Sequence, residues 1–194
     1  MVGDDMENID TPLRFNTRGE WREWLQENYN RSKGIWFVFP LKASGEKAIS
    51  YNDAVEEALC FGWIDSTVRS FDKNYKIQRF SPRNPKSSYS QSNKERLGWL
   101  ADNGQIHPSV AETVSRVLSE EFVFPEDILE AIKADENVWE RFQSFSDPYK
   151  RIRVAYIDAA RISPDEFGKR LNNFIDKTRK GKLIAGYGGI DKYY

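Results

Sequence analysis

The sequence is short of the residues that most metal and disulfide sites need. Its 194 residues include one cysteine, Cys60, and one histidine, His107. A single cysteine excludes a disulfide within the chain and a zinc site built from several cysteines. A single histidine excludes a histidine-rich metal site, and a Ser-His-Asp arrangement could use only His107. We therefore expect neither a metal nor any other cofactor.

Long apolar runs and an excess of one charge are also missing. No run approaches the roughly 18 apolar residues that a membrane-spanning helix needs. Residues 1–10 are acidic, whereas a signal peptide begins with basic and then apolar residues. We therefore expect a cytoplasmic protein that does not insert into a membrane. The formal net charge is -1, so the overall electrostatic field of the protein does not favour nucleic acid. Any anion site must therefore be a local cluster of positive charges.

Helix-capping pairs, apolar stripes and alternating side chains predict the elements of the N-terminal half. In chain order they are a helix over 17–29, a strand over 35–39, a helix over 50–62, a β-hairpin over 63–80 and a polar loop over 81–88. Ser90 then caps a helix that ends at Asn103 and Gly104.

Helices alone are predicted after this point, over 108–119, 125–134, 137–142, 147–160 and 163–180. The fold class is therefore α+β, with a small antiparallel or mixed sheet packed with several helices and a mostly helical C-terminal part. Four segments follow from this pattern: a disordered N-terminus over 1–10, an α+β domain over 11–120, a helical region over 121–180, and a tail over 181–194. The tail carries no pattern that predicts its structure.

The densest run of polar and aromatic residues lies between Cys60 and Asn93. If the hairpin brings Arg69 and Arg79 onto paired strands beside the loop that holds Arg83 and Lys86, their cationic groups converge on one anion. The helix after Ser90 would add backbone donors and the positive end of its dipole. The alternative is that these arginines are solvated or form surface ion pairs with Asp65 and Asp72. The candidate ligand-binding residues are Trp63, Asp65, Arg69, Arg79, Arg83, Lys86, Ser88, Tyr89, Ser90 and Asn93.

Cys60 and His107 are weaker candidates for chemistry. Cys60 falls in the last turn of a helix, where the negative end of the dipole raises the pKa of a thiol, so we expect a buried and inert side chain. His107 precedes a proline in a loop and could act as a base only if the fold brought it close to a nucleophile. We expect a loop histidine without a catalytic role.

Three motifs carry a resemblance to a known family. They are Ala58 to Asp65, Arg79 to Arg83, and Ser87 to Ser90 with Asn93, and the similarity extends to 21–25, 34–36 and 125–180. On these residues the chain resembles the YdeI or OmpD-associated family, also called bacteriocin-protection proteins. Ser66 stands where the family usually has glycine, and Tyr89 stands where tryptophan is common.

The resemblance implies a biology rather than a reaction, because the family is linked to resistance to antimicrobial peptides or bacteriocins and to stress responses. The resemblance implies that the functional residues are those that fall on the motifs: Asp65, Arg79, Arg83, Ser88, Tyr89, Ser90 and Asn93.

Three functions stay open at this point. The first is a protein that binds a small anion or a phosphate-bearing ligand, with Arg79, Arg83 and Lys86 neutralising its charge and with Trp63 and Tyr89 as apolar walls. The second is a hydrolase or transferase that uses Asp65 as general base, with Arg79 and Arg83 holding the substrate. The third is an interaction module, in which the C-terminal helices bind a partner protein or a second copy of the chain.

Overall fold

The computed structural model describes residues 11–186 and 190–194 and divides into two compact units. The N-terminal unit holds the chain up to Ser88 together with Leu100–Val114. The C-terminal unit holds Tyr89–Trp99 and Ser115–Tyr194. The chain enters the C-terminal unit for the last time after Val114, close to the predicted boundary at residue 120. That residues 89–99 also belong to the C-terminal unit was not predicted. The disorder predicted for residues 1–10 lies outside the described residues.

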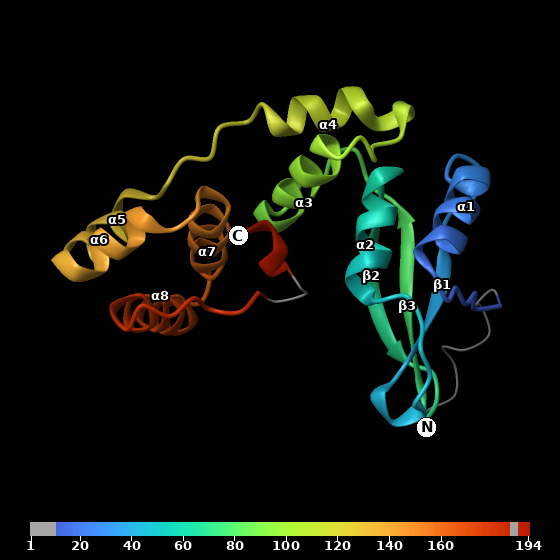
Figure 1. The fold of residues 1–194 in the computed structure, drawn as a ribbon, viewed down its shortest axis with the longest axis horizontal. Coiled ribbons are helices and arrows are strands. Elements are labelled where there is room, and N and C mark those ends of the chain that lie inside the picture. The colour runs from blue at the N-terminus through green and yellow to red at the C-terminus, as the bar shows by residue number, and fades with distance from the viewer. Residues whose placement is uncertain (1–10, 187–189) are drawn as a thin grey trace. The chain divides into compact units, whose positions relative to one another are not determined.

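A three-stranded antiparallel sheet forms the base of the N-terminal unit (Figure 1). Its strands are β1 (Ile35–Pro40), β2 (Trp63–Ser70) and β3 (Tyr75–Pro82), and β3 lies in the middle. The predicted strand and hairpin are therefore confirmed. A bulge between Asp65 and Val68 interrupts the pairing of β2 with β3.

Two helices cover one face of this sheet, α1 (Arg18–Asn28) and α2 (Tyr51–Cys60). The predicted caps are present, because Thr17 accepts a hydrogen bond from the amide of Glu20 at 3.2 Å and Ser50 accepts one from the amide of Asp53 at 3.1 Å. Each bond satisfies an amide that has no partner inside its helix. A short 3-10 helix, η1 (Lys42–Ser44), precedes α2.

Aromatic side chains fill the space between these helices and the sheet. Trp21 is fully buried, and its ring centroid lies 5.2 Å from that of Phe37 and 5.7 Å from that of Phe80. Its indole nitrogen donates to the carbonyl of Ala54 at 3.0 Å, which joins α1 to α2. Buried indoles that find an acceptor combine a large apolar area with a satisfied donor.

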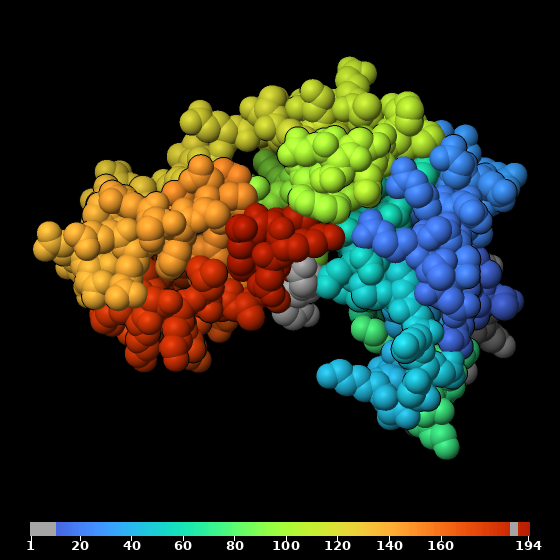
Figure 2. Space-filling model, viewed as in Figure 1, coloured from blue at the N-terminus to red at the C-terminus, as the bar shows by residue number. Residues whose placement is uncertain are grey.

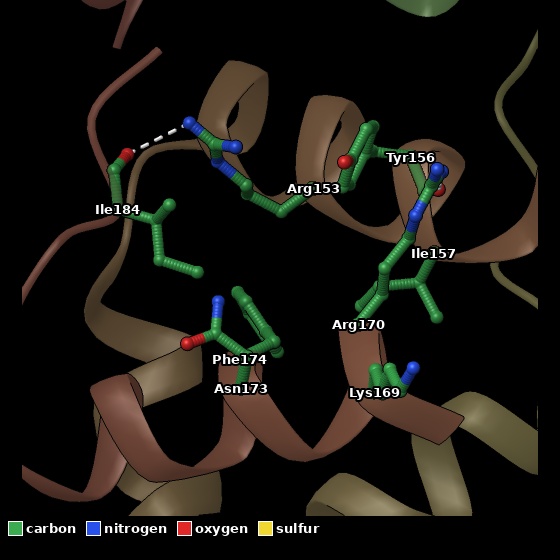
Figure 3. Close-up of a pocket in the computed structure, with 8 residues that line it drawn as sticks. All are labelled: Arg153, Tyr156, Ile157, Lys169, Arg170, Asn173, Phe174 and Ile184. Atoms are coloured by element: carbon green, nitrogen blue, oxygen red, sulfur yellow. Dashed lines mark hydrogen bonds between the residues drawn. The ribbon is translucent and has the colours of Figure 1, made fainter. Parts of the chain in front are cut away.

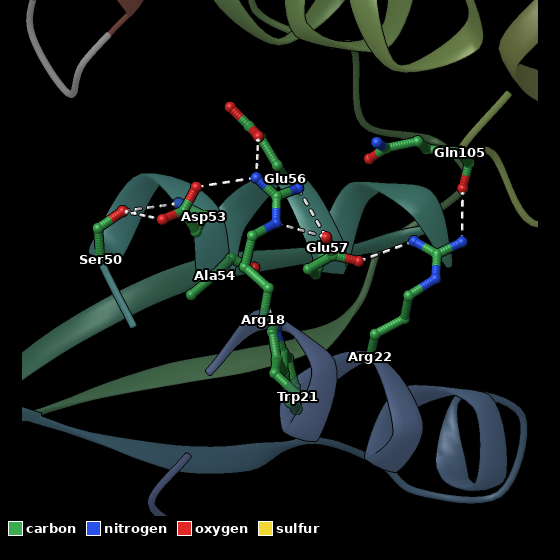
Figure 4. Close-up of polar contacts among 9 residues, drawn as sticks. All are labelled: Arg18, Trp21, Arg22, Ser50, Asp53, Ala54, Glu56, Glu57 and Gln105. Carbon is green, nitrogen blue, oxygen red and sulfur yellow. Dashed lines mark hydrogen bonds and ion pairs between the residues drawn. The ribbon is translucent and has the colours of Figure 1, made fainter. Parts of the chain in front are cut away.

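Ion pairs hold the same two helices together at the edge of the core (Figure 4). Arg18 of α1 contacts Asp53 at 2.8 Å, Glu56 at 2.9 Å and Glu57 at 2.6 Å, and Arg22 contacts Glu57 at 2.8 Å. Burial lowers the pKa of Arg18, but the hydrogen bonds and charges of Glu57 and Glu56 outweigh this and raise it above its ordinary value. The raised pKa keeps the guanidinium of Arg18 charged.

Two helices cross from one unit to the other. α3 (Gln91–Asp102) begins in the C-terminal unit and ends in the N-terminal unit, where Gly104 follows it with a φ of 64°. A 3-10 turn, η2 (Pro108–Val110), leads into α4 (Ala111–Leu118), which crosses back.

The C-terminal unit is helical, as predicted (Figure 1). Its main helices are α5 (Glu126–Lys133), α6 (Glu136–Ser144), α7 (Asp147–Asp158) and α8 (Pro164–Arg179). Their buried core consists of Ile128, Ile132, Val138, Phe142, Tyr149, Val154, Ile157 and Phe174. In the described part of the chain no helix is long and apolar enough to cross a membrane.

The described part of the tail is ordered against α7. The 3-10 helix η3 (Ile190–Tyr193) buries Ile190 and Tyr193 in a cluster with Ile152. The hydroxyl of Tyr149 also accepts a hydrogen bond from the amide of Ile184 at 3.0 Å. These contacts give Ile184, Ile190 and Tyr193 a structural role that no sequence pattern indicated.

Candidate functional site

Asp65 lies on the face of the sheet that the helices cover. It pairs with Phe80 across the antiparallel ladder, and paired residues share a face. Its Oδ2 accepts hydrogen bonds from the hydroxyl of Tyr51 at 2.7 Å and from the side-chain amide of Gln78 at 2.6 Å. Two neutral donors therefore hold the half-buried carboxylate in place.

Arg69 and Arg79 lie on the opposite face. Arg79 adjoins Phe80 on β3 and pairs with Trp36, while Arg69 pairs with Ile77, two residues before Arg79. The guanidinium of Arg69 lies 5.1 Å from the centre of the Trp36 ring. The predicted approach of the two arginines on paired strands is thus consistent with the register. Because their side chains leave the sheet away from Asp65, the structure does not pair that carboxylate with Arg79.

The loop after β3 is organised around Arg83. Its Nη2 donates to the carbonyls of Ser87 at 3.0 Å and Ser88 at 2.9 Å, so this guanidinium bridges the loop. Lys86 is exposed on the same loop. The contacts of Arg83 with main-chain carbonyls hold the loop in shape.

Trp63 is part of the hydrophobic core. It is 1% exposed, and its indole nitrogen donates to the carbonyl of Tyr29 at 3.0 Å. It packs edge-on against Trp24 at 5.7 Å. The predicted role as an apolar wall for a ligand does not fit this position, because Trp21 and Trp24 of α1 pack against the ring and close it off from solvent.

The remaining predicted residues belong to the C-terminal unit. Ser90 caps α3 by accepting the amide of Asn93 at 3.3 Å, as predicted. Asn93 in turn accepts a hydrogen bond from Arg96 at 2.9 Å, and Tyr89 is half-buried. Tyr89, Ser90 and Asn93 therefore belong to a different compact unit from Arg79, Arg83 and Lys86.

Cys60 and His107 occupy structural positions. Cys60 is fully buried, and burial, followed by the charge of Glu57, raises the pKa of its thiol to about 11. The ring of His107 stacks on Phe61 at 4.8 Å and accepts the amide of Ser109 at 3.3 Å, which caps η2. The burial of Cys60 and the loop position of His107 agree with the sequence analysis.

A cavity that the sequence analysis missed lies in the C-terminal unit (Figure 3). It holds about 150 Å³ and lies between α7, α8 and the segment that follows α8. Each helix contributes residues at helical spacing, and Figure 3 shows their side chains surrounding the opening from different sides. The lining residues are Arg153, Tyr156, Ile157, Lys169, Arg170, Asn173, Phe174 and Ile184.

Arg153 is the buried cation of this cavity. It is 6% exposed, and its Nη2 donates to the carbonyls of Ile184 at 2.7 Å and Ala185 at 2.8 Å and to the hydroxyl of Tyr194 at 2.5 Å. Its Nε is buried and has no hydrogen-bond partner among the described residues. A buried donor without an acceptor is uncommon in proteins and marks a position where an acceptor is expected.

Two further cations come from α8. Arg170 donates from Nε to Glu166 at 2.8 Å, and its guanidinium lies 3.9 Å from the centre of the Tyr156 ring. Lys169 is exposed and forms no ion pair with any residue that the structure describes. The lining thus contains three cations and no carboxylate, in a chain whose positive and negative charges nearly balance.

The sequence carried a signal for this cavity that the apolar stripe of α7 concealed. The stripe includes Ile152, Tyr156 and Ile157, but Tyr156 is 48% exposed and does not pack into the core. The buried residue at the neighbouring position is the charged Arg153. An arginine within a buried helical face needs acceptors or a ligand, and this was the available clue.

Among residues 11–186 and 190–194, no group of three or more His, Cys, Asp or Glu side chains is placed so that it could hold a metal ion. No curated protein and no solved structure matches the chain.

Two family models match the chain. Residues 121–181 match the model described as "Bacteriocin-protection, YdeI or OmpD-Associated", which confirms the predicted family on the helical region. Residues 13–113 match the model described as "Domain of unknown function (DUF8412)", and the motifs between Ala58 and Asn93 lie within that match. The cavity residues of α7 and α8 fall inside the first match, and Ile184 lies just beyond it. The chain therefore belongs to the DUF8412 family over its N-terminal half and carries a bacteriocin-protection, YdeI or OmpD-associated domain at residues 121–181.

Proposed function

We propose that the chain binds a small anionic ligand in the cavity between α7 and α8. The observation that carries this proposal is the lining of the cavity, which holds the three cations Arg153, Lys169 and Arg170 and no carboxylate. Cationic side chains that converge on one concave site favour an anionic ligand.

The charges around the cavity support the same ligand. Arg153, Lys169 and Arg170 contribute three positive charges, and among the described residues only Arg170 is paired with a carboxylate. Apolar walls lower the local dielectric constant and strengthen the attraction of an anion for these groups. The cavity lies in the domain linked to bacteriocin protection, so ligand binding there would serve resistance or stress tolerance in the cytoplasm.

A thermal-shift experiment on the full-length protein tests this function. The panel contains phosphate, sulfate, nucleotides and carboxylates, with neutral analogues for comparison. A bound anion raises the unfolding midpoint with a saturable dose dependence, because binding stabilises only the folded state. Lys169→Glu places a negative charge at the cavity and is expected to abolish the shift.

The matched control is Lys177→Glu, which changes the net charge by the same amount on an exposed residue of α8 that does not line the cavity. This variant should keep the shift. A panel in which no anion raises the midpoint, or an equal loss of the shift in both variants, would refute binding at this cavity.

The N-terminal unit offers a second candidate anion site, favoured by the fact that neither Arg79 nor Lys86 pairs with a carboxylate in the described residues. Arg79 donates to the carbonyl of Lys33 at 3.3 Å and Lys86 is exposed. Arg79→Ala should then abolish an anion-induced shift that Lys169→Glu leaves intact. The enzyme and the protein-partner or homodimer hypotheses stay predictions, and Asp65→Asn is the variant that tests turnover.

A further inference from the structure

We infer that the segment after α8 is a strap that closes the cavity between α7 and α8, and that an anion in the cavity strengthens this closure. The strap consists of the described residues 184–186 and 190–194, which dock on α7. The inference rests on the proposed function and adds the regulation of the same site. It follows from the contacts of the strap, from the wall that it supplies, and from the charge that it buries.

Side chains of α7 hold both described parts of the strap. Nη2 of Arg153 donates to the carbonyls of Ile184 at 2.7 Å and Ala185 at 2.8 Å. The same nitrogen donates to the hydroxyl of Tyr194 at 2.5 Å. The hydroxyl of Tyr149 accepts the amide of Ile184 at 3.0 Å. Ile184 is thus bonded to α7 through both its amide and its carbonyl, and one arginine fixes both parts of the strap.

The strap also supplies part of the cavity wall. Ile184 lines the cavity with residues of α7 and α8, and it packs against the core cluster that contains Phe174. Figure 3 shows its carbonyl joined to Arg153 at one side of the cavity. A strap that left α7 would take this wall away, so the site is enclosed only while the strap is docked.

Docking of the strap buries a charge without neutralising it. Arg153 is 6% exposed, and the oxygens that it binds belong to two carbonyls and a hydroxyl, which carry no net charge. In the part of the chain that the structure describes, no carboxylate pairs with it. A buried cation without a counter-ion is unfavourable. An anion in the cavity therefore offsets part of the cost of docking.

The strap and the anion are coupled for these two reasons. An anion among Arg153, Lys169 and Arg170 compensates the buried charge and gains the wall of Ile184, so it favours the docked strap. By thermodynamic linkage, the docked strap favours the anion by the same factor. The compensation acts through the electrostatic field, so it needs no contact with the buried Nε of Arg153.

Amide hydrogen exchange, followed by NMR on the full-length protein, measures the opening of the strap. The reporter is the amide of Ile184. The comparison is the amide of Val138 in α6, which donates to Asp135 at 3.2 Å and does not belong to the strap. The probes are phosphate, sulfate, adenosine monophosphate and acetate.

Each probe that raises the unfolding midpoint should slow the exchange of Ile184. At ten times its dissociation constant we expect the rate to fall about three- to tenfold, because exchange then requires an open strap that has lost the anion. The exchange of Val138 should stay the same. Lys169→Glu should remove the effect of the anion on Ile184, and Lys177→Glu should keep it.

A tyrosine variant tests the strap without any ligand. Tyr194→Phe removes a hydroxyl that Arg153 binds and keeps the ring, so the amide of Ile184 should exchange about fivefold faster, the effect of one lost hydrogen bond. The matched control is Tyr29→Phe, which makes the same change in the N-terminal unit and should leave this rate as it is in the wild type.

The outcomes separate the strap from the proposed function. An anion that raises the midpoint but leaves the exchange of Ile184 unchanged would overturn the coupling and leave anion binding intact. Faster exchange with bound anion would also overturn it, because the strap and the anion would then compete for Arg153. Equal rates in Tyr194→Phe and the wild type would show that Arg153 does not hold the strap. Silence of the midpoint towards all four probes would overturn both proposals.

Discussion

Replacing Glu57 by glutamine should destabilise the N-terminal unit more than any change of a surface charge. The carboxylate of Glu57 joins two helices, accepting from Arg18 at 2.6 Å and Arg22 at 2.8 Å. Its side chain is 4% exposed, whereas those of the arginines are 33% and 38% exposed. The substitution keeps the shape of the side chain, removes its charge and turns an amide donor towards one of the guanidinium groups.

The magnitude follows from this burial. Breaking a fully buried ion pair costs about 3–5 kcal/mol, but water reaches one-third of each arginine and repays part of that loss. We therefore expect Glu57→Gln to lower the free energy of unfolding by about 2–3 kcal/mol. Asp53→Asn acts on the same network at a carboxylate that is 36% exposed, so it should cost about 0–1 kcal/mol.

Urea unfolding followed by tryptophan fluorescence measures the difference. Trp21, Trp24 and Trp63 lie together beside this network, with the first two stacked at 5.4 Å, so their emission reports the packing of α1. A loss of 2–3 kcal/mol lowers the urea midpoint by about 1 M. The matched control is Glu27→Gln, on an exposed glutamate of α1, with an expected change within about 0.5 kcal/mol. If Glu57→Gln and Glu27→Gln had the same midpoint, the network would contribute nothing to stability.

Three further predictions concern the backbone, a helix cap and the buried thiol. Gly34→Ala should lower the free energy of unfolding in urea by about 2 kcal/mol or more, because φ is 128° and a Cβ would lie 2.6 Å from the carbonyl oxygen of Phe80. A Cβ at Gly168 in α8 meets no atom within 4 Å. Gly168→Ala should therefore raise the free energy of unfolding by about 0.5–1 kcal/mol. Ser146→Ala removes the cap that accepts the amide of Tyr149 and should cost about 1 kcal/mol in the same assay. Cys60 should resist iodoacetamide at pH 8 until the protein is denatured, because burial raises the pKa of its thiol to about 11. Rapid alkylation of the native protein would contradict this expectation. A thiol whose pKa is raised on folding stabilises the folded state at pH values below its ordinary pKa, so this stabilisation is lost as the pH rises from about 9 to about 11.

The elements of the fold could be predicted because their signals are local. Thr17 and Ser50 mark the starts of α1 and α2 through a hydrogen bond to an amide three residues away, which the sequence displays directly. The hairpin is equally local, since its turn spans only a few residues. The register of the strands could not be predicted in this way, because the bulge after Asp65 depends on the partner strand. This bulge changes the face of the sheet on which every later residue of β2 lies.

The candidate site in the N-terminal half was harder to predict for the same reason. Nearness in the sequence suggested that Asp65, Arg79 and Trp63 act together, yet alternation along the strands sends Arg79 to one face and the other two to the opposite face. Trp63 was assigned to a ligand because it lies in a polar stretch, but its strand faces the helices and buries it. A motif on two paired strands therefore needs its register before its residues can be combined into one site.

The cavity in the C-terminal unit could not be predicted from periodicity, because the groups that define Arg153 are distant in the chain. Its acceptors lie 31, 32 and 41 residues further on, at Ile184, Ala185 and Tyr194, in a segment without a recognisable pattern. Helical spacing alone predicts that Arg153 is a polar residue beside an apolar stripe and is exposed to solvent. The charge is the informative feature, because an arginine can be buried in a helix only where acceptors are supplied from elsewhere. Three oxygens of the tail satisfy one end of this guanidinium, whereas Nε has no hydrogen-bond partner among the described residues, so the position of the acceptors in the tail is what allows an arginine to be buried on α7.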